Sequence, residues 1–216
     1  MRHHEHTRAY LVRHGETEWN QDRPGYCGWS DIPLNEKGRA QANALACRFD
    51  GEGVAVVLSS DLARARDTAS AIAVHSRNAA PQVDARFREL NYGVWEGKSP
   101  EELWCEYPDQ FAAWKEDPVA VPAGGAETLA QVVDRAAPAL QAWVDRYRGQ
   151  SIVLVAHKTT VRLLICWALG LPLKEYTRIL QQNGAVNLLE FRGKQAHLAL
   201  CNDVCHLPGD LCSPAM

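Results

Sequence analysis

Ala9-Tyr10-Leu11-Val12 is a short apolar run that leads directly into Arg13-His14-Gly15. Two further runs of this kind, residues 54–58 and 152–156, lie far along the chain. Each run is apolar on both faces, which is typical of strands buried in a parallel sheet. We therefore expect three buried strands, with the polar residues that follow them gathered at one edge of a sheet.

Helical patterns separate these runs. Apolar residues recur at helical spacing over residues 35–46, 62–72, 129–147 and 161–169. Ser60 is the candidate N-cap of the second helix, and Pro138 predicts a kink or a break in the third. Residues 186–191 and 196–200 flank a turn-like stretch and predict paired strands. This alternation favours an α/β sandwich with helices on both faces of a mainly parallel sheet.

The bulk composition is that of one ordinary globular domain. The 216 residues are 46% apolar and 23% charged, and we expect a single domain over residues 7–207 with loose termini at 1–6 and 208–216. A net charge of −3 gives no field that would gather nucleic acid or an anionic membrane. The sequence contains no apolar stretch long enough to span a bilayer. Seven cysteines, scattered and odd in number, indicate reduced thiols and a cytoplasmic location.

Histidine and arginine side chains follow all three runs. Arg13 and His14 follow the first run, Arg64 lies shortly after the second, and His157 follows the third. Together they predict an anion pocket suited to phosphoryl transfer, because guanidinium groups stabilise the charged oxygens of the transferring group. A neutral imidazole can attack phosphorus and form a covalent intermediate. Gly15 removes a side chain where we expect the backbone to pass close to the phosphate.

Six motifs, in order, carry a resemblance to a known family. They are Leu11-Val12-Arg13-His14-Gly15-Glu16-Thr17 with Trp19-Asn20, Leu34-Asn35-Glu36-Lys37-Gly38, Ser60-Asp61-Leu62 with Arg64-Ala65 and Thr68-Ala69, Arg88-Glu89-Leu90 with Tyr92-Gly93 and Trp95-Glu96-Gly97, Val155-Ala156-His157, and Asn202-Asp203 with His206-Leu207. Over essentially the whole chain they resemble the histidine phosphatase superfamily, the phosphoglycerate-mutase-like proteins. The resemblance implies the three-layer α/β sandwich of that family.

The resemblance also implies a role for each matching residue. The implied catalytic residues are His14 as the nucleophile, Glu89 as the proton donor and later the base, and Arg13, Arg64 and His157 as ligands of the phosphoryl group. The implied substrate-binding residues are Asn20, which adds a phosphate hydrogen bond, and Thr17, Cys27 and Gly28, which lie along the substrate's approach. No metal and no organic cofactor is implied. Many family members are dimers or tetramers, and a homo-oligomer stays open here.

One position departs from the family pattern. The family usually has a small residue, most often Gly, after its second catalytic histidine, and this chain has Lys158. A lysine adds bulk and a positive charge beside the pocket. We hypothesise that Lys158 binds a second anionic group on the substrate, because a long ammonium side chain can swing aside and act as a point charge.

The expected function is a phosphatase acting on small phosphorylated metabolites, without nucleic acid or membrane as partners. The short stretch between Gly97 and Glu127, and Gly124-Gly125-Ala126-Glu127-Thr128 itself, resemble the phosphatase branch. Two alternatives stay open: a cofactor-dependent phosphoglycerate mutase and a non-catalytic protein that binds phosphate ligands. A zinc site among Cys201, Cys205, His206 and Cys212 is a weak further alternative, since the spacing fits no standard site.

Overall fold

The centre of the molecule is a six-stranded sheet in the order β3-β2-β4-β1-β5-β6. The structure is a computed structural model that describes residues 6–21, 25–76 and 80–212. The strands are β1 (Thr7–Arg13), β2 (Val54–Ser59), β3 (Gln82–Val83), β4 (Ser151–Ala156), β5 (Val186–Arg192) and β6 (Gln195–Asp203). The pairs β1–β4, β2–β4 and β2–β3 are parallel, whereas β5 runs antiparallel to both of its neighbours. The expected mainly parallel sheet and the paired C-terminal strands are therefore confirmed.

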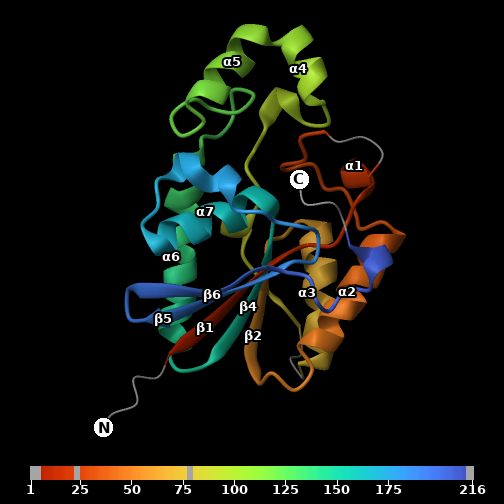
Figure 1. The fold of residues 1–216 in the computed structure, drawn as a ribbon, viewed down its shortest axis with the longest axis vertical. Coiled ribbons are helices and arrows are strands. Elements are labelled where there is room, and N and C mark those ends of the chain that lie inside the picture. The colour runs from red at the N-terminus through yellow and green to blue at the C-terminus, as the bar shows by residue number, and fades with distance from the viewer. Residues whose placement is uncertain (1–5, 22–24, 77–79, 213–216) are drawn as a thin grey trace.

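Helices cover both faces of this sheet (Figure 1). The helices α2 (Glu36–Arg48) and α3 (Ala63–His75) pack on one face, and α6 (Leu129–Arg146) and α7 (Lys158–Leu169) pack on the other. Successive β1 side chains point to opposite faces of the sheet. Leu11 packs with α6 and α7, whereas Tyr10 and Val12 pack with α2 and α3. Two hydrophobic layers against one buried sheet make the three-layer sandwich that the sequence predicts.

One local prediction is wrong, and of the kink or break expected at Pro138 the break is absent. The N-cap of α3 is Leu62 rather than Ser60, whose hydroxyl hydrogen-bonds to a histidine instead. The Pro138 ring does not break α6, which runs as one helix over 18 residues. The residues on both sides of Pro138 are buried against the sheet, among them Ala137 and Leu140, so burial offsets the hydrogen bond that proline cannot donate.

Two short helices, α4 (Pro100–Glu106) and α5 (Pro108–Glu116), stand above the carboxyl ends of the strands (Figure 1). Ser99 and Glu102 form a capping box at the start of α4, and proline begins each helix. Phe111 and Trp114 of α5 pack on each other and on Trp95, edge to face or stacked. This aromatic cluster joins the α4–α5 pair to α6 and α7, because Leu129 and Leu163 of those helices belong to the same apolar core.

Short elements complete the chain. They are α1 (Glu18–Gln21) and the 3-10 turns η1 (Ala85–Phe87), η2 (Gly93–Trp95), η3 (Leu173–Arg178) and η4 (Gly209–Leu211). The segment 208–212 is not loose as expected, since Gln41 Nε2 of α2 donates to the Leu211 carbonyl at 2.7 Å and Lys37 Nζ donates to the Cys212 carbonyl at 3.3 Å. The rest of the expected loose ends, residues 1–5 and 213–216, lies outside the described residues.

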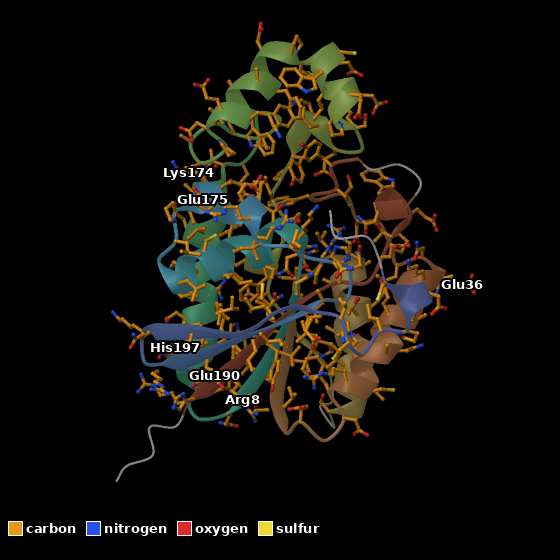
Figure 2. The ribbon with its side chains drawn as sticks, in the orientation of Figure 1. Arg8, Glu36, Lys174, Glu175, Glu190 and His197 are labelled. Carbon is orange, nitrogen blue, oxygen red and sulfur yellow. The ribbon has the colours of Figure 1, made fainter. Side chains whose placement is uncertain are left out.

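Charged side chains lie on neighbouring strands at the amino end of β1. Arg8 of β1 lies opposite Glu190 of β5, which lies opposite His197 of β6. Figure 2 shows these three side chains together at the lower end of the sheet, far from the α4–α5 pair. Among the residues that the structure describes, no helix has both the length and the apolar character that crossing a membrane requires.

Candidate active site

Strand register brings two histidines side by side. Arg13 of β1 pairs with Ala156 of the parallel strand β4, so the residues that follow, His14 and His157, leave the sheet as neighbours. The backbone N–H of His14 still donates to the Ala156 carbonyl at 3.0 Å. The two imidazole rings lie 5.1 Å apart, centroid to centroid, and both are buried. Residues that are 143 positions apart in the chain thus meet because their strands are adjacent and parallel.

His14 is held in the form that a nucleophile needs. Its Nδ1 lies 2.6 Å from its neighbour's carbonyl oxygen, that of Gly15, so Nδ1 carries the hydrogen and Nε2 keeps a free lone pair. Burial holds the pKa of His14 well below its ordinary value, and the charges of Arg64 and Arg13 lower it further. The imidazole is therefore neutral at physiological pH, and its Nε2 can attack an electrophile.

His157 is oriented by Ser60. The hydroxyl of Ser60 lies 2.7 Å from His157 Nε2 and accepts from the Leu62 N–H at 3.4 Å, so the hydroxyl hydrogen is free to point at Nε2. If the Ser60 hydroxyl donates to Nε2, the ring hydrogen of His157 is on Nδ1, which is buried without a partner among the described residues. Burial, followed by the charge of Arg64, holds the pKa of His157 well below its ordinary value. His157 thus offers one neutral N–H donor to the site.

Arg64 is held by the loop of residues 28–30, which is held in turn by the carboxylate of Glu96. Its two terminal nitrogens donate to the carbonyls of Ser30 at 2.8 Å and Gly28 at 2.6 Å. The backbone N–H groups of that loop, from Gly28 to Ser30, in turn donate to the carboxylate of Glu96 at 2.8–3.2 Å. Arg64 is 1% exposed, and its Nε has no partner in the described part of the chain.

Arg13 completes a set of buried donors. One terminal nitrogen of Arg13 donates to the Gln181 carbonyl at 2.7 Å, whereas its Nε, like that of Arg64, is buried without a partner among the described residues. Burial lowers the pKa of Arg13 to about 10, so its guanidinium group stays charged at neutral pH. Buried N–H groups without acceptors are costly. Arg13 Nε, Arg64 Nε and His157 Nδ1 are thus all buried without a partner among the described residues.

Glu89 lies at the start of α7, where three backbone N–H groups donate to its carboxylate. The donors are Leu90 at 2.9 Å, Thr159 at 2.9 Å and Thr160 at 3.1 Å. The carboxylate is 4% exposed and interacts electrostatically with Arg13 and Lys158. The first turn of α7 therefore holds Glu89 facing the arginine and lysine side chains of the site.

The backbone that carries Glu89 is itself held from α6 and from the Gly28–Ser30 loop. Arg135 donates to the carbonyls of Arg86 at 2.6 Å, Arg88 at 2.9 Å and Glu89 at 2.9 Å. The same guanidinium forms a bidentate ion pair with Glu127, at 2.7 and 3.0 Å. Trp29 Nε1 also donates to the Glu89 carbonyl at 2.9 Å.

Residues 9–204 of the chain match the family model described as the histidine phosphatase superfamily (branch 1). The chain belongs to this superfamily. The six-stranded three-layer fold agrees with this membership, and the chain is a phosphoric monoester hydrolase, as the sequence motifs predict.

Named members of this superfamily resemble the chain along most of its length. Phosphoserine phosphatase 1 of Hydrogenobacter thermophilus is 33% identical over 197 residues, which are 91% of this chain and 92% of that protein. The Escherichia coli protein named probable phosphoglycerate mutase GpmB is 34% identical over 190 residues, 85% of each chain. The crystal structure of the α-ribazole phosphatase from Shigella flexneri has a TM-score of 0.82 at 26% identity, and the match covers 91% of this chain and 96% of that one.

Other residues expected in the site of this histidine phosphatase occupy supporting positions. Thr17 is fully buried, and its N–H and hydroxyl both donate to Asn20 Oδ1 at 3.1 Å, so Thr17 holds Asn20 near His14. Gly28 supplies a carbonyl to Arg64, and Cys27 beside it is half-buried with a pKa that burial raises to about 11. Direct contacts of Asn20, Thr17, Cys27 and Gly28 with a substrate stay predictions.

Gly15 makes a close backbone contact that the sequence did not predict. A side-chain carbon at Gly15 would collide with the carbonyl oxygen of Gly38, at the start of α2. A side-chain carbon at Gly38 would likewise collide with the carbonyl oxygen of Glu16. Two glycines therefore let the loop after β1 and the first turn of α2 touch through their backbones, and this contact sets the position of His14.

Several residues that shape the site were not identified as functional from the sequence. Ser60 was interpreted as a helix cap. It directly follows β2, which pairs with the strand that leads to His157, and this position indicates that it could contact that histidine. Arg135 lies on a helix whose pattern indicates only packing. Gln181 and Asn183 come from the connection before β5, and Asn183 Nδ2 donates both to the His14 carbonyl and to Asn20 Oδ1 at 3.2 Å. That contact depends on tertiary structure and has no local sequence signal.

The described residues contain no group of three or more histidine, cysteine or acidic side chains that could hold a metal ion. The weak zinc alternative, which involved Cys201, Cys205, His206 and Cys212, is therefore not supported. Cys205 instead donates to Asp203 at 3.4 Å, and the Cys212 thiol lies 3.9 Å from the Leu207 carbonyl.

Proposed function

We propose that this histidine phosphatase hydrolyses small phosphate monoesters through a phosphohistidine on His14. The observation that carries the proposal is the buried, neutral His14, whose Nδ1 is tied to the Gly15 carbonyl while unfilled N–H donors surround it. The donors of Arg13, Arg64 and His157 would bind the phosphoryl oxygens during transfer, and Asn20 adds a further polar group at the same place.

In the first half-reaction, His14 Nε2 attacks phosphorus, the new N–P bond forms, and the bond from phosphorus to the ester oxygen breaks. The leaving alkoxide takes a proton from Glu89. Because all three backbone groups at Glu89 are donors, its carboxyl group acts as an acceptor before substrate arrives. A monoester monoanion brings one ionisable proton, which can pass to Glu89 and then to the leaving group.

In the second half-reaction, water attacks the phosphohistidine. Glu89 takes a proton from that water, the N–P bond breaks, and His14 Nε2 regains its lone pair as inorganic phosphate leaves. The overall change is one ester and one water consumed, with one alcohol and one phosphate formed. The chain supplies every group that these steps use, and none of them is a metal or an organic cofactor.

The test is phosphate release from a panel of small phosphate esters by the wild type and by His14→Ala. We expect release to fall by about 10³-fold or more in the variant, because the covalent route is lost. The matched control is His197→Ala, an exposed histidine on β6 at the opposite end of the sheet (Figure 2), for which we expect unchanged release. Equal loss in both variants, or persistence of activity without His14, would contradict the mechanism.

A mutase is the second candidate, since a 34% identical relative carries that name. A mutase passes the phosphoryl group to an organic acceptor instead of water. Labelling of the wild type by 2,3-bisphosphoglycerate without phosphate release from any ester would identify it. Binding of esters without release or labelling would instead indicate the non-catalytic alternative.

A further inference from the structure

Lys158 is the first residue of α7 and directly follows His157. Arg162 lies one helical turn further along the same face of α7. Its side chain is nearly buried, and its Nε donates to the Ile179 carbonyl at 2.5 Å. We propose that Lys158, backed by Arg162, binds a carboxylate of the substrate, so that the favoured substrates are small phosphate monoesters that also carry a carboxylate. This inference rests on the proposed phosphatase function and narrows its substrate class.

The ammonium group of Lys158 is half-buried and lacks an acceptor. Two other lysines that are partly covered form ion pairs: Lys37 with Glu16 at 3.6 Å and Lys98 with Glu106 at 2.7 Å. The Lys158 side chain forms no hydrogen bond and no ion pair within residues 6–21, 25–76 and 80–212. A ligand anion would supply the acceptor that this partly buried ammonium group lacks within the described residues.

The charged groups around Lys158 are mostly positive, which favours the binding of an anion. Arg13 and Arg162 act on it with like charge, and Glu89 is the carboxylate among the described residues that opposes them. Burial, together with these two arginines, lowers the pKa of Lys158 to about 8. Arg13, Arg64 and His157 already provide donors for a phosphoryl group. Lys158 therefore adds positive charge beyond what the phosphoryl group uses.

The position of Lys158 sets the size and charge of the group it would bind. Adjacent α-carbons are about 3.8 Å apart, so Lys158 is anchored beside His157, and its electrostatic interaction with Arg13 and Glu89 places its ammonium group near the same site. The Arg162 guanidinium already donates to the Ile179 carbonyl. The ammonium group of Lys158 is therefore the donor that we assign to the carboxylate. A single point charge matches a monoanionic carboxylate better than a second phosphate dianion.

Two esters that differ only in the carboxylate give the direct test. O-phosphoserine carries it, and O-phosphoethanolamine has hydrogen in its place. We expect the wild type to favour phosphoserine by about tenfold or more in kcat/KM, the size of one charge-assisted hydrogen bond. In Lys158→Met the ratio should fall below about threefold, and Lys158→Arg should keep most of it. The control is Lys194→Met, in the exposed turn between β5 and β6 beside the amino end of β1, which should keep the wild-type ratio.

A binding measurement separates this inference from the proposed function. Titration calorimetry on His14→Ala, with and without Lys158→Met, compares the affinities of the same two esters when no turnover occurs. Tighter binding of phosphoserine that depends on Lys158 supports the subsite, even if the wild type hydrolyses neither ester and the phosphatase proposal fails. Equal affinity for both esters, or a preference that survives Lys158→Met in a variant with the wild-type circular dichroism spectrum, overturns the subsite.

Discussion

At the scale of single residues, the site depends on which nitrogen of each histidine carries the hydrogen. His14 is set by the Gly15 carbonyl and His157 by the Ser60 hydroxyl, and these two contacts leave opposite ring nitrogens facing the pocket. His14 presents a lone pair from Nε2, whereas His157 presents a hydrogen from Nδ1. In the proposed mechanism one histidine attacks while the other stabilises the phosphoryl oxygens, although both are neutral and buried.

Ser60→Ala tests this assignment. Without the hydroxyl, His157 is free to place its hydrogen on Nε2 and turn its lone pair toward the phosphoryl group. We expect kcat to fall about tenfold, as is usual when an orienting partner of a functional histidine is removed. The control is Ser76→Ala, whose hydroxyl donates to the Ile72 carbonyl at the far end of α3. Steady-state kinetics with one ester measures both; a kcat equal to wild type in Ser60→Ala would refute the assignment.

At the scale of elements, α6 holds the acid in place. Arg135 joins three carbonyls of the segment before Glu89 to the carboxylate of Glu127, which also accepts from the Asn91 N–H at 3.0 Å. A helix that packs on the sheet thereby fixes the loop that delivers Glu89 to the site. The interaction is made by one planar guanidinium group, which a lysine could not imitate.

Arg135→Met should affect esters that need a proton donor more than those that do not. We expect kcat for an alkyl phosphate to fall at least about tenfold, and kcat for p-nitrophenyl phosphate to fall much less, because nitrophenolate leaves without protonation. The control is Arg146→Met on the same helix, an exposed arginine that stacks on Trp143 at 5.4 Å. Equal losses for both esters in Arg135→Met would assign Arg135 to stability alone.

At the scale of the whole molecule, two buried neutral histidines link folding to pH. The pKa values of His14 and His157 are both lowered in the folded state, chiefly by burial. Below about pH 6.5 the unfolded chain takes up protons that the folded chain does not, so acidification stabilises the unfolded state. The free energy of unfolding should fall by up to about 1.4 kcal/mol per pH unit for each histidine.

Urea denaturation at pH 7.5, 6.5 and 5.5 measures this loss. His14→Ala should lose stability less steeply below pH 6.5 than the wild type, because one of the two proton acceptors is gone. If the free energy of unfolding falls equally steeply below pH 6.5 in both proteins, groups other than His14 cause the loss of stability in acid. The contribution of the two histidines should be constant above about pH 7, since both are then neutral in either state.

Much of this architecture was predictable, because its signals are local. Continuous apolar runs identified β1, β2 and β4, helical spacing identified α2, α3, α6 and α7, and the order of strand exits placed His14 and His157 together. The α4–α5 pair was not predicted, although Ser99-Pro100-Glu101-Glu102 is a capping-box pattern that announces a helix. The uninterrupted α6 and the docked segment 208–212 could not be predicted, since both depend on packing against distant residues.

The backbone contact between Gly15 and Gly38 has a consequence for how this enzyme can change. Any first substitution at either position meets a carbonyl oxygen of the main chain, which no rotamer change can move aside. A second substitution at the other glycine cannot compensate, because no residue is smaller than glycine. In a saturation library of these two codons, we expect active clones to be glycine at both. Selection for new substrates will have to work through other positions, such as Lys158.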